Sequence, residues 1–203
     1  MMTPLQKKFY KKILFSLKEG DSLAWRGTGL LAKGIQWADN AYYNHVDGTV
    51  YKCNKSHQWR VIRSWYGGVE DVPLVRALAD YDKGKGADIC IIRPIVSAEQ
   101  TKQRIKWLKE QVGNNRGYDH KLLLLHLLYL KGNKFLSKFG IKLSEKFLYK
   151  FDNENRYVCS ELFQWSMIEI GDESFRSEAL VTPNDVVIGN RDTIAILYND
   201  QNK

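Results

Sequence analysis

The sequence predicts an α+β fold, because segments with helical periodicity alternate with short runs typical of hairpin strands. The chain has 203 residues, of which 44% are hydrophobic, and this is enough for one well-buried core. It contains no internal repeat, no low-complexity tract and no convincing domain boundary. We therefore expect residues 1–203 to form one domain, with an N-terminal helix at 1–18 and a helical lid or insertion at 122–151.

Helices are expected where apolar residues recur at helical spacing or where a capping residue precedes them. Apolar residues at intervals of four, such as Phe9 and Ile13, favour an amphipathic helix near the N-terminus. Ser97 and Gln100 have the spacing of a capping box. An apolar run at 122–130 is too short to cross a bilayer and is expected to be a core or lid helix. The expected helices cover 4–18, 30–39, a short segment ending at 81, 99–112, 122–130 and 159–171.

Strands are expected in short extended runs that end in turn-forming residues. The runs 45–52 and 59–65 flank a polar segment at 53–58, and this pattern is typical of a hairpin. Apolar residues at 88–93 stop at Pro94, which favours a buried strand. Two further strands are expected at 22–26 and 193–198.

The composition excludes several classes of protein. The net charge is +8, but the lysines are spread along helices among acidic residues, so we expect no specific nucleic-acid binding. Three widely spaced cysteines and four histidines form no zinc motif, and we expect no metal and no cofactor. The N-terminal residues lack the apolar segment of a signal peptide. A cytoplasmic protein with free thiols is therefore expected.

Cys159 and His45 are the candidate catalytic residues. Cys159 stands at the start of a predicted helix, and His45 lies on a predicted strand. The dipole and the N–H groups of a helix N-terminus stabilise a thiolate, and a neighbouring imidazole lowers the pKa of the thiol further. On these residues alone, a cysteine nucleophile with a histidine base and a small buried thiol are both open interpretations.

Six short motifs follow one another along residues 19–198. They are GDSLAWRG at 20–27, LLAKGIQW at 30–37, YNHV at 43–46, GYD at 117–119, YVCSEL at 157–162 and TPND at 182–185. In this order they resemble the YiiX-like, circularly permuted branch of the NlpC-type cysteine peptidases and amidases. The resemblance implies a papain-like fold with permuted topology, in which an antiparallel sheet packs against the nucleophile helix. Permutation explains why the histidine precedes the cysteine.

The resemblance also implies the chemistry. Cys159 would attack an amide carbonyl and form a thioester, and His45 would act as the base. Backbone N–H groups at the start of the Cys159 helix would contribute to the oxyanion hole. Glu161, Tyr118 and Asp21 are candidate substrate-binding residues.

The third catalytic position departs from the family pattern. The family places a carboxylate on the strand after the histidine, and the alignment puts Arg63 there. Ser64 and His57 are the alternative residues for orienting the imidazole, and the choice stays open. Asp47 stands where the family has a glycine. A hairpin turning near Asn54 would place Arg63 opposite His45, with its guanidinium directed to solvent or to an anionic substrate group.

Two alternatives to an amidase follow from the same residues. The lecithin–retinol acyltransferase group shares the histidine-first order, so a lipid thioesterase or acyltransferase is the second candidate. The run 122–130 and the basic, aromatic segment after it would then form an acyl-binding lid or a membrane-facing surface. The third candidate is an inactive binding protein, which Arg63 favours. The expected partner is a peptide or a lipid-linked substrate; with cell wall as substrate, a phage-encoded protein is expected.

Overall fold

The computed structural model describes residues 4–80, 88–113, 117–144, 156–172, 181–189 and 193–196. These residues form seven helices and seven strands. The helices are α1 (Pro4–Ser16), α2 (Leu30–Asp39), α3 (Leu74–Asp80), α4 (Ala98–Gln111), α5 (His120–Ser137), α7 (Cys159–Ile168) and α8 (Pro183–Gly189). The strands are β1 (Ser22–Arg26), β2 (His45–Val46), β3 (Thr49–Lys52), β4 (Trp59–Trp65), β5 (Gly68–Pro73), β6 (Asp88–Ile92) and β7 (Thr193–Ile196).

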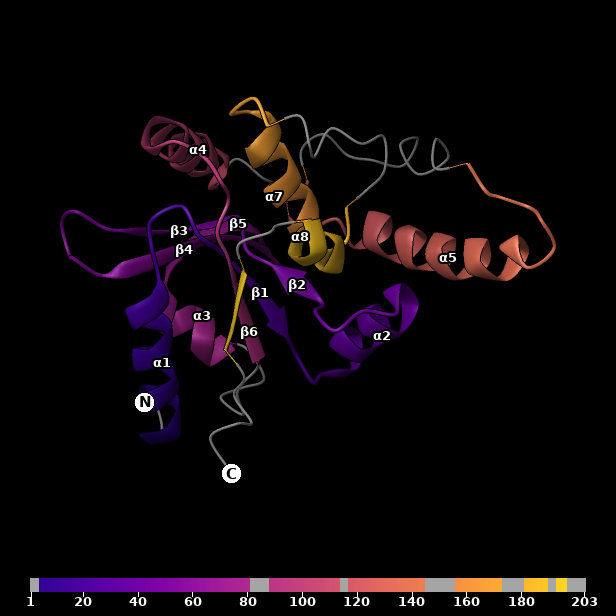
Figure 1. The fold of residues 1–203 in the computed structure, drawn as a ribbon, viewed down its shortest axis with the longest axis horizontal. Coiled ribbons are helices and arrows are strands. Elements are labelled where there is room, and N and C mark those ends of the chain that lie inside the picture. Colours follow the sequence, from indigo (N-terminus) through magenta and orange to yellow (C-terminus); the bar gives the residue numbers. More distant parts are fainter. Residues whose placement is uncertain are drawn as a thin grey trace.

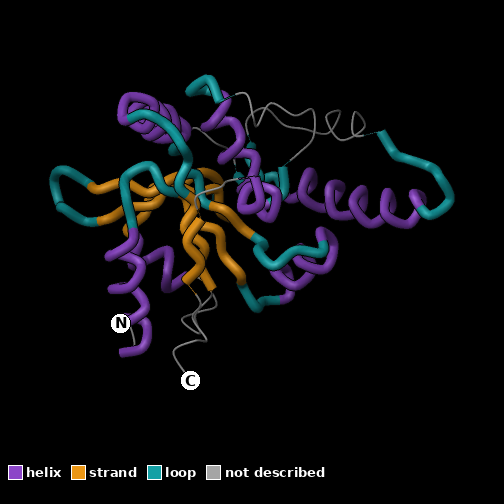
Figure 2. The backbone as a smooth tube through the Cα atoms, in the orientation of Figure 1, coloured by secondary structure: helices purple, strands orange, loops and turns teal. Residues whose placement is uncertain are grey.

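The α+β class is confirmed, but the expected antiparallel sheet is two sheets. One has the strand order β2-β1-β6-β7 and the other β3-β4-β5, and both are antiparallel. Helices α1 and α3 lie on one side of the strands, while α4, α7 and α8 lie on the other (Figures 1 and 2). Parts of four predicted segments, at 1–3, 81, 145–151 and 197–198, lie outside the described residues.

The run predicted as one strand at 45–52 crosses from one sheet to the other. The Asp47 N–H donates to the Leu23 carbonyl in β1, whereas the Gly48 N–H donates to the Ile62 carbonyl in β4. A Cβ added to Gly48 would lie 3.0 Å from a Leu108 side-chain atom and 3.1 Å from the Ile62 carbonyl. Glycine therefore allows the close approach of the two sheets at this crossing.

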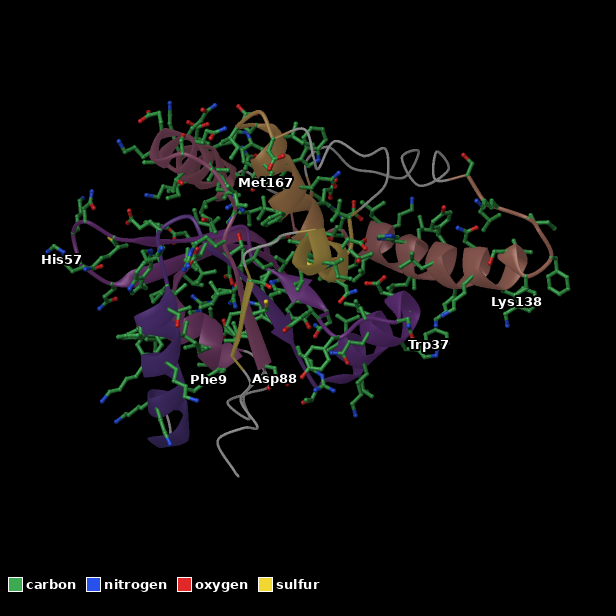
Figure 3. All side chains as sticks on the ribbon, viewed as in Figure 1. Phe9, Trp37, His57, Asp88, Lys138 and Met167 are labelled. Carbon is green, nitrogen blue, oxygen red and sulfur yellow. The ribbon has the colours of Figure 1, made fainter. Side chains whose placement is uncertain are left out.

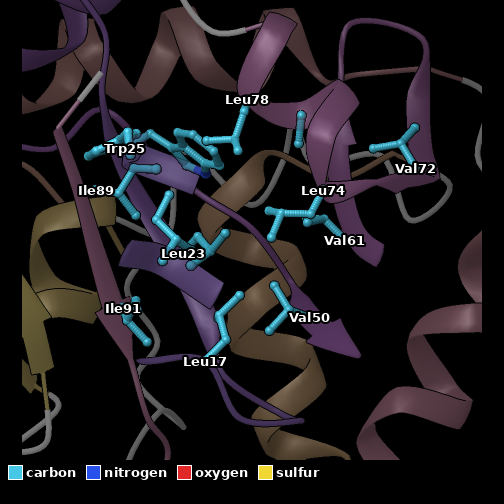
Figure 4. Close-up of a cluster of buried hydrophobic side chains, with 13 residues drawn as sticks. Leu17, Leu23, Trp25, Val50, Val61, Val72, Leu74, Leu78, Ile89 and Ile91 are labelled. Atoms are coloured by element: carbon cyan, nitrogen blue, oxygen red, sulfur yellow. The ribbon is translucent and has the colours of Figure 1, made fainter. Parts of the chain in front are cut away.

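The largest apolar cluster fills the space between the two sheets, α1 and α3. It contains Leu23 and Trp25 of β1, Val61 of β4, and Leu74 and Leu78 of α3 (Figure 4). The intervening residues of the first sheet, such as Ala24 and Cys90, face the opposite way and pack with Phe163 of α7. Because successive side chains of a strand alternate between faces, the first sheet is covered on both sides.

Helix α5 is longer than the predicted apolar run. Asp119 caps it, since its carboxylate accepts a hydrogen bond of 2.8 Å from the Leu122 N–H. Helix α5 packs against α2 and extends away from the sheets (Figure 1). Of the helices that are described, none has the length and apolar character required to cross a membrane.

Candidate active site

Cys159 is the first residue of α7. The backbone of Val158 is extended, and its N–H donates a hydrogen bond of 3.1 Å to the Glu161 carboxylate, which caps the helix. Glu161 is buried. The carboxylate that was predicted to contact substrate thus caps the helix, and its contact with substrate stays a prediction. The helix N-terminus supplies partial positive charge beside the Cys159 sulfur.

His45 lies on β2, the edge strand of the first sheet, and pairs with Trp25 of β1. Its ring Nε2 lies 3.0 Å from Asp47 Oδ1. The second oxygen of Asp47 accepts a hydrogen bond of 2.6 Å from the Trp25 indole N–H. Asp47 is fully buried, so both carboxylate oxygens are engaged inside the protein. Because Nε2 is hydrogen-bonded to Asp47, Nδ1 is the ring nitrogen that can face the Cys159 thiol.

Cys159 and His45 are joined by a side-chain hydrogen bond, and each changes the pKa of the other. Burial lowers the pKa of His45, but the Cys159 thiolate and Asp47 outweigh it and bring the pKa to about 9. Burial raises the pKa of Cys159, but the His45 charge and hydrogen bonds from His45, the Val46 N–H and Tyr118 bring it below its ordinary value. The two shifts favour a thiolate–imidazolium pair around neutral pH.

Tyr118 lies beside the sulfur. Its hydroxyl is 3.7 Å from Cys159 Sγ, and the Cys159 N–H donates to the hydroxyl oxygen. Burial and the neighbouring thiolate raise the pKa of Tyr118 well above its usual value, so the phenol stays protonated and can act as a donor. A backbone bridge between Tyr118 and Tyr157 holds this segment next to the start of α7.

Two of the three residues considered for orienting His45 bind other groups, and the third lies in an exposed turn. Arg63 pairs in register with Glu70, and its guanidinium binds Glu70 at 2.7 Å and also binds Asp80. Arg63 is fully buried, so the prediction that its guanidinium reaches solvent or substrate is wrong. The Ser64 hydroxyl donates to the Tyr157 carbonyl at 2.6 Å. His57 lies exposed in the β3–β4 turn, at the far end of the molecule from α2 (Figure 3).

The alignment failed because the chain crosses between sheets immediately after His45. The hairpin register pairs Thr49 with Ile62, and His45 pairs with β1 instead of with β4. The residue on β4 that was aligned with the family carboxylate therefore cannot lie opposite the ring. The sequence did carry a usable signal, since residues two apart in an extended segment share a face and Asp47 is two residues after His45.

Asp21, the remaining candidate for substrate binding, is bonded to other parts of the protein. It is buried, and each of its carboxylate oxygens lies 2.9 Å from the Arg93 guanidinium. Its Oδ2 also accepts a hydrogen bond from the Lys18 N–H. The Gly-Asp motif thus ties the end of the α1 segment to β6.

A cavity of about 510 Å³ opens beside His45. Its walls include Leu30, Leu31 and Ile35 of α2, Trp65 of β4, and Tyr118. A second gap, of only about 20 Å³, lies between Cys159 and α5. The larger of these two cavities borders His45 and Tyr118, and its walls are mainly apolar and aromatic.

Comparisons with known proteins agree with the fold. The crystal structure of metalloprotein yiiX from Escherichia coli O157:H7, described as DUF1105, matches with a TM-score of 0.54 and 16% sequence identity. The match covers 88% of this chain and 96% of the yiiX chain. No family model and no curated protein matches the sequence. This chain shares the yiiX fold.

The residues around Cys159 do not fit a metal ion. Both oxygens of Asp47 are used by His45 and Trp25, so among the described residues Asp47 is not available as a third ligand beside the cysteine and the histidine. Within the described ranges, no cluster of three or more histidine, cysteine, aspartate or glutamate residues could hold a metal. The site therefore brings together a thiol, an imidazole and a carboxylate.

Arg104 of α4 connects the elements that carry the site. Its guanidinium donates to the carbonyl of Gly48, the residue after Asp47, and to the Gly20 carbonyl at 2.9 Å. It also binds the hydroxyls of Ser22 in β1 and Ser166 in α7, each at 2.9 Å. Burial lowers the pKa of Arg104 to about 9. One fully buried side chain thus links the sheet crossing that carries Asp47 to the nucleophile helix.

Proposed function

We propose that this protein is a cysteine hydrolase that cleaves an amide bond through a thioester on Cys159. The observation that carries the proposal is the position of the His45 ring, which is hydrogen-bonded to buried Asp47 and to the Cys159 thiol. An imidazole held between a carboxylate and a nucleophile is the arrangement that general base catalysis requires. Asp47 takes the role of orienting residue.

Each half of the reaction uses the same groups. The Cys159 thiolate attacks the amide carbonyl carbon, and the Cys159 N–H and the Tyr118 hydroxyl are the nearest donors for the oxyanion. The imidazolium of His45 protonates the leaving amine as the C–N bond breaks, which leaves a thioester. His45 then takes a proton from water, the hydroxide adds to the thioester, and the C–S bond breaks to release a carboxylate.

A lipid thioesterase or acyltransferase is the second candidate, and the apolar cavity favours it. The walls contributed by Leu30, Leu31 and Ile35 suit a hydrocarbon chain better than a polar peptide. The first half of the reaction would be unchanged, with a lipid acyl group on Cys159. The main argument for an inactive binding protein was Arg63 in place of the orienting carboxylate. This argument is weakened, because Arg63 binds Glu70 and Asp80.

Alkylation of Cys159 as a function of pH tests the activated thiol. The test uses a Cys53→Ser background, because Cys53 is a partly exposed thiol whose pKa is lowered by hydrogen bonds from Ser56 and would also react. Iodoacetamide should label Cys159 with a midpoint below the free-thiol value of about 8.5. In His45→Ala the midpoint should rise above that value, because burial then acts without a compensating charge.

A midpoint near the free-thiol value that does not change in His45→Ala would refute the proposal. Cys159→Ser on the same background is the control for labelling elsewhere. The bond class is tested by incubation with short muropeptides and, separately, with phospholipid, followed by mass spectrometry of Cys159. Lipid acylation of Cys159 without cleavage of peptides would replace the amidase by the second candidate.

A further inference from the structure

Helix α5 carries a stripe of exposed apolar side chains. Leu124, Leu128 and Phe135 are 58%, 61% and 61% exposed. Their spacings of four and seven residues place them on one side of a helix with 3.6 residues per turn. The buried residues of the same helix, Leu122 and His126, lie on another side. The apolar stripe is therefore not the face that α5 packs against the protein.

Helix α2 extends this apolar surface. Leu30 and Trp37 are 90% and 68% exposed, and their spacing of seven places them on one side of the helix. Lys131 Nζ of α5 lies 3.9 Å from the centre of the Trp37 ring, which joins the two helices. We call the surface formed by Leu30, Lys33, Trp37, Leu124, Leu128, Lys131 and Phe135 the α2–α5 face. Figure 3 shows Trp37 and Lys138 at this end of the molecule.

The charges along α5 and the segment after it have one sign. Residues 120–144 contain five lysines and no aspartate or glutamate. Lys33 adds a further positive charge from α2. A surface that combines exposed apolar side chains with lysines matches the boundary between the acyl chains and the headgroups of an anionic membrane. A protein partner would need an acidic rim around an apolar groove.

The face is continuous with the cavity of the candidate active site. Leu30 and Leu31 are exposed and also line the cavity beside His45. A membrane in contact with the face would lie at the mouth of this cavity. A substrate carried by a lipid would then reach the site without leaving the membrane surface.

We propose that the α2–α5 face docks the protein onto anionic lipid membranes. The docking itself does not depend on the proposed chemistry, whereas delivery of a lipid-linked substrate rests on the proposed function. The apolar side chains enter the acyl boundary, and the lysines bind the anionic headgroups. Insertion of apolar side chains and binding of headgroups by lysines together give stable but reversible attachment.

Flotation of the full chain with vesicles tests the docking. The probes are vesicles of phosphatidylcholine alone and of phosphatidylcholine mixed with phosphatidylglycerol, and the chain carries Cys159→Ser so that chemistry cannot affect the result. Binding is expected to the mixed vesicles only, and it should weaken as salt is raised. Lys33→Glu and Lys131→Glu, which alter the two lysines of the face, should each lower the partition coefficient about fivefold. Leu128→Ser with Phe135→Ser should lower it at least tenfold.

The matched controls alter exposed residues elsewhere. Lys102→Glu and Lys106→Glu change lysines on α4, and Phe15→Ser removes an apolar side chain that is 95% exposed on α1. These variants should bind as well as the parent, apart from a small general effect of charge. A chain that binds neither kind of vesicle would overturn the proposal. Equal losses of vesicle binding in the control and face variants would overturn it too. Self-association through the face without vesicle binding would replace the membrane by a second copy of the chain.

Discussion

The two sides of the candidate active site are built from opposite kinds of residue. On the side formed by β2, α4 and α7, polar groups such as Asp47, Arg104 and Glu161 are buried and hydrogen-bonded to the protein. On the side formed by α2 and α5, apolar groups such as Leu30 and Leu128 are exposed.

This difference separates two tasks. A buried polar group costs free energy unless its hydrogen bonds are all made. The arrangement that satisfies them is therefore strongly favoured, and it holds the reacting atoms in one geometry. Exposed apolar groups contribute little to folding, so their position is explained better by what the protein contacts. Substitutions on the two sides should therefore have different consequences, and the following experiments compare them.

The largest effect on stability is expected at Arg104. Arg104→Leu removes the donor that serves the Gly20 and Gly48 carbonyls and leaves these buried oxygens without it. We expect a loss of about 3–5 kcal/mol in the free energy of unfolding, measured in urea. Arg104→Lys should recover part of the loss, because an ammonium group can serve some of the same acceptors. A loss below about 1 kcal/mol would show that the hydrogen bonds of Arg104 do not hold the buried polar side together.

Asp47→Asn tests the orientation of His45 with almost no change in shape. An amide has one acceptor oxygen, so either His45 or Trp25 must face an N–H group in place of an oxygen. We expect the rate of Cys159 alkylation at neutral pH to fall by about tenfold to a hundredfold, and the pKa of His45 to fall with the loss of the carboxylate charge. Measurement of the His45 pKa by NMR separates this effect from a change in fold. An unchanged pKa would remove Asp47 from the triad.

His126 lies where the two sides meet, on the buried face of α5. Burial lowers its pKa to about 4, partly offset by the charge of Asp185. Below the unfolded value of about 6.5, the unfolded chain binds a proton that the folded chain does not. The folded protein should therefore lose up to about 3 kcal/mol of stability as the pH falls from 6.5 to about 4. His126→Leu should remove this part of the pH dependence, seen by comparing urea unfolding at pH 7 and pH 4.5.

The smallest effect is expected on the exposed stripe of α5. Leu128→Ser should change the free energy of unfolding by less than about 0.5 kcal/mol, because the side chain is already in water. Leu122→Ala on the same helix is the matched comparison, since Leu122 is 1% exposed and should cost about 2–5 kcal/mol. Similar losses in both variants would mean that Leu128 packs against the protein in solution.

Much of the local structure could be predicted from the sequence. The helix at 30–39, the capping box of Ser97 and Gln100 and the hairpin around 53–58 are found where they were expected. Each depends on residues that are close together in the chain, so the sequence contains the interacting groups side by side. The positions of Cys159 at a helix start and His45 on a strand were predicted for the same reason.

The sequence by itself therefore determined the element types, the α+β class and the thiol–imidazole pair as candidates. Only the tertiary structure decided that the run 45–52 serves two sheets, that Asp47 is hydrogen-bonded to the His45 ring, and that Arg63 binds Glu70 and Asp80. The contacts of Arg104 join residues up to 84 positions apart. Local periodicity carries no information on such pairings, because they depend on how whole sheets and helices pack.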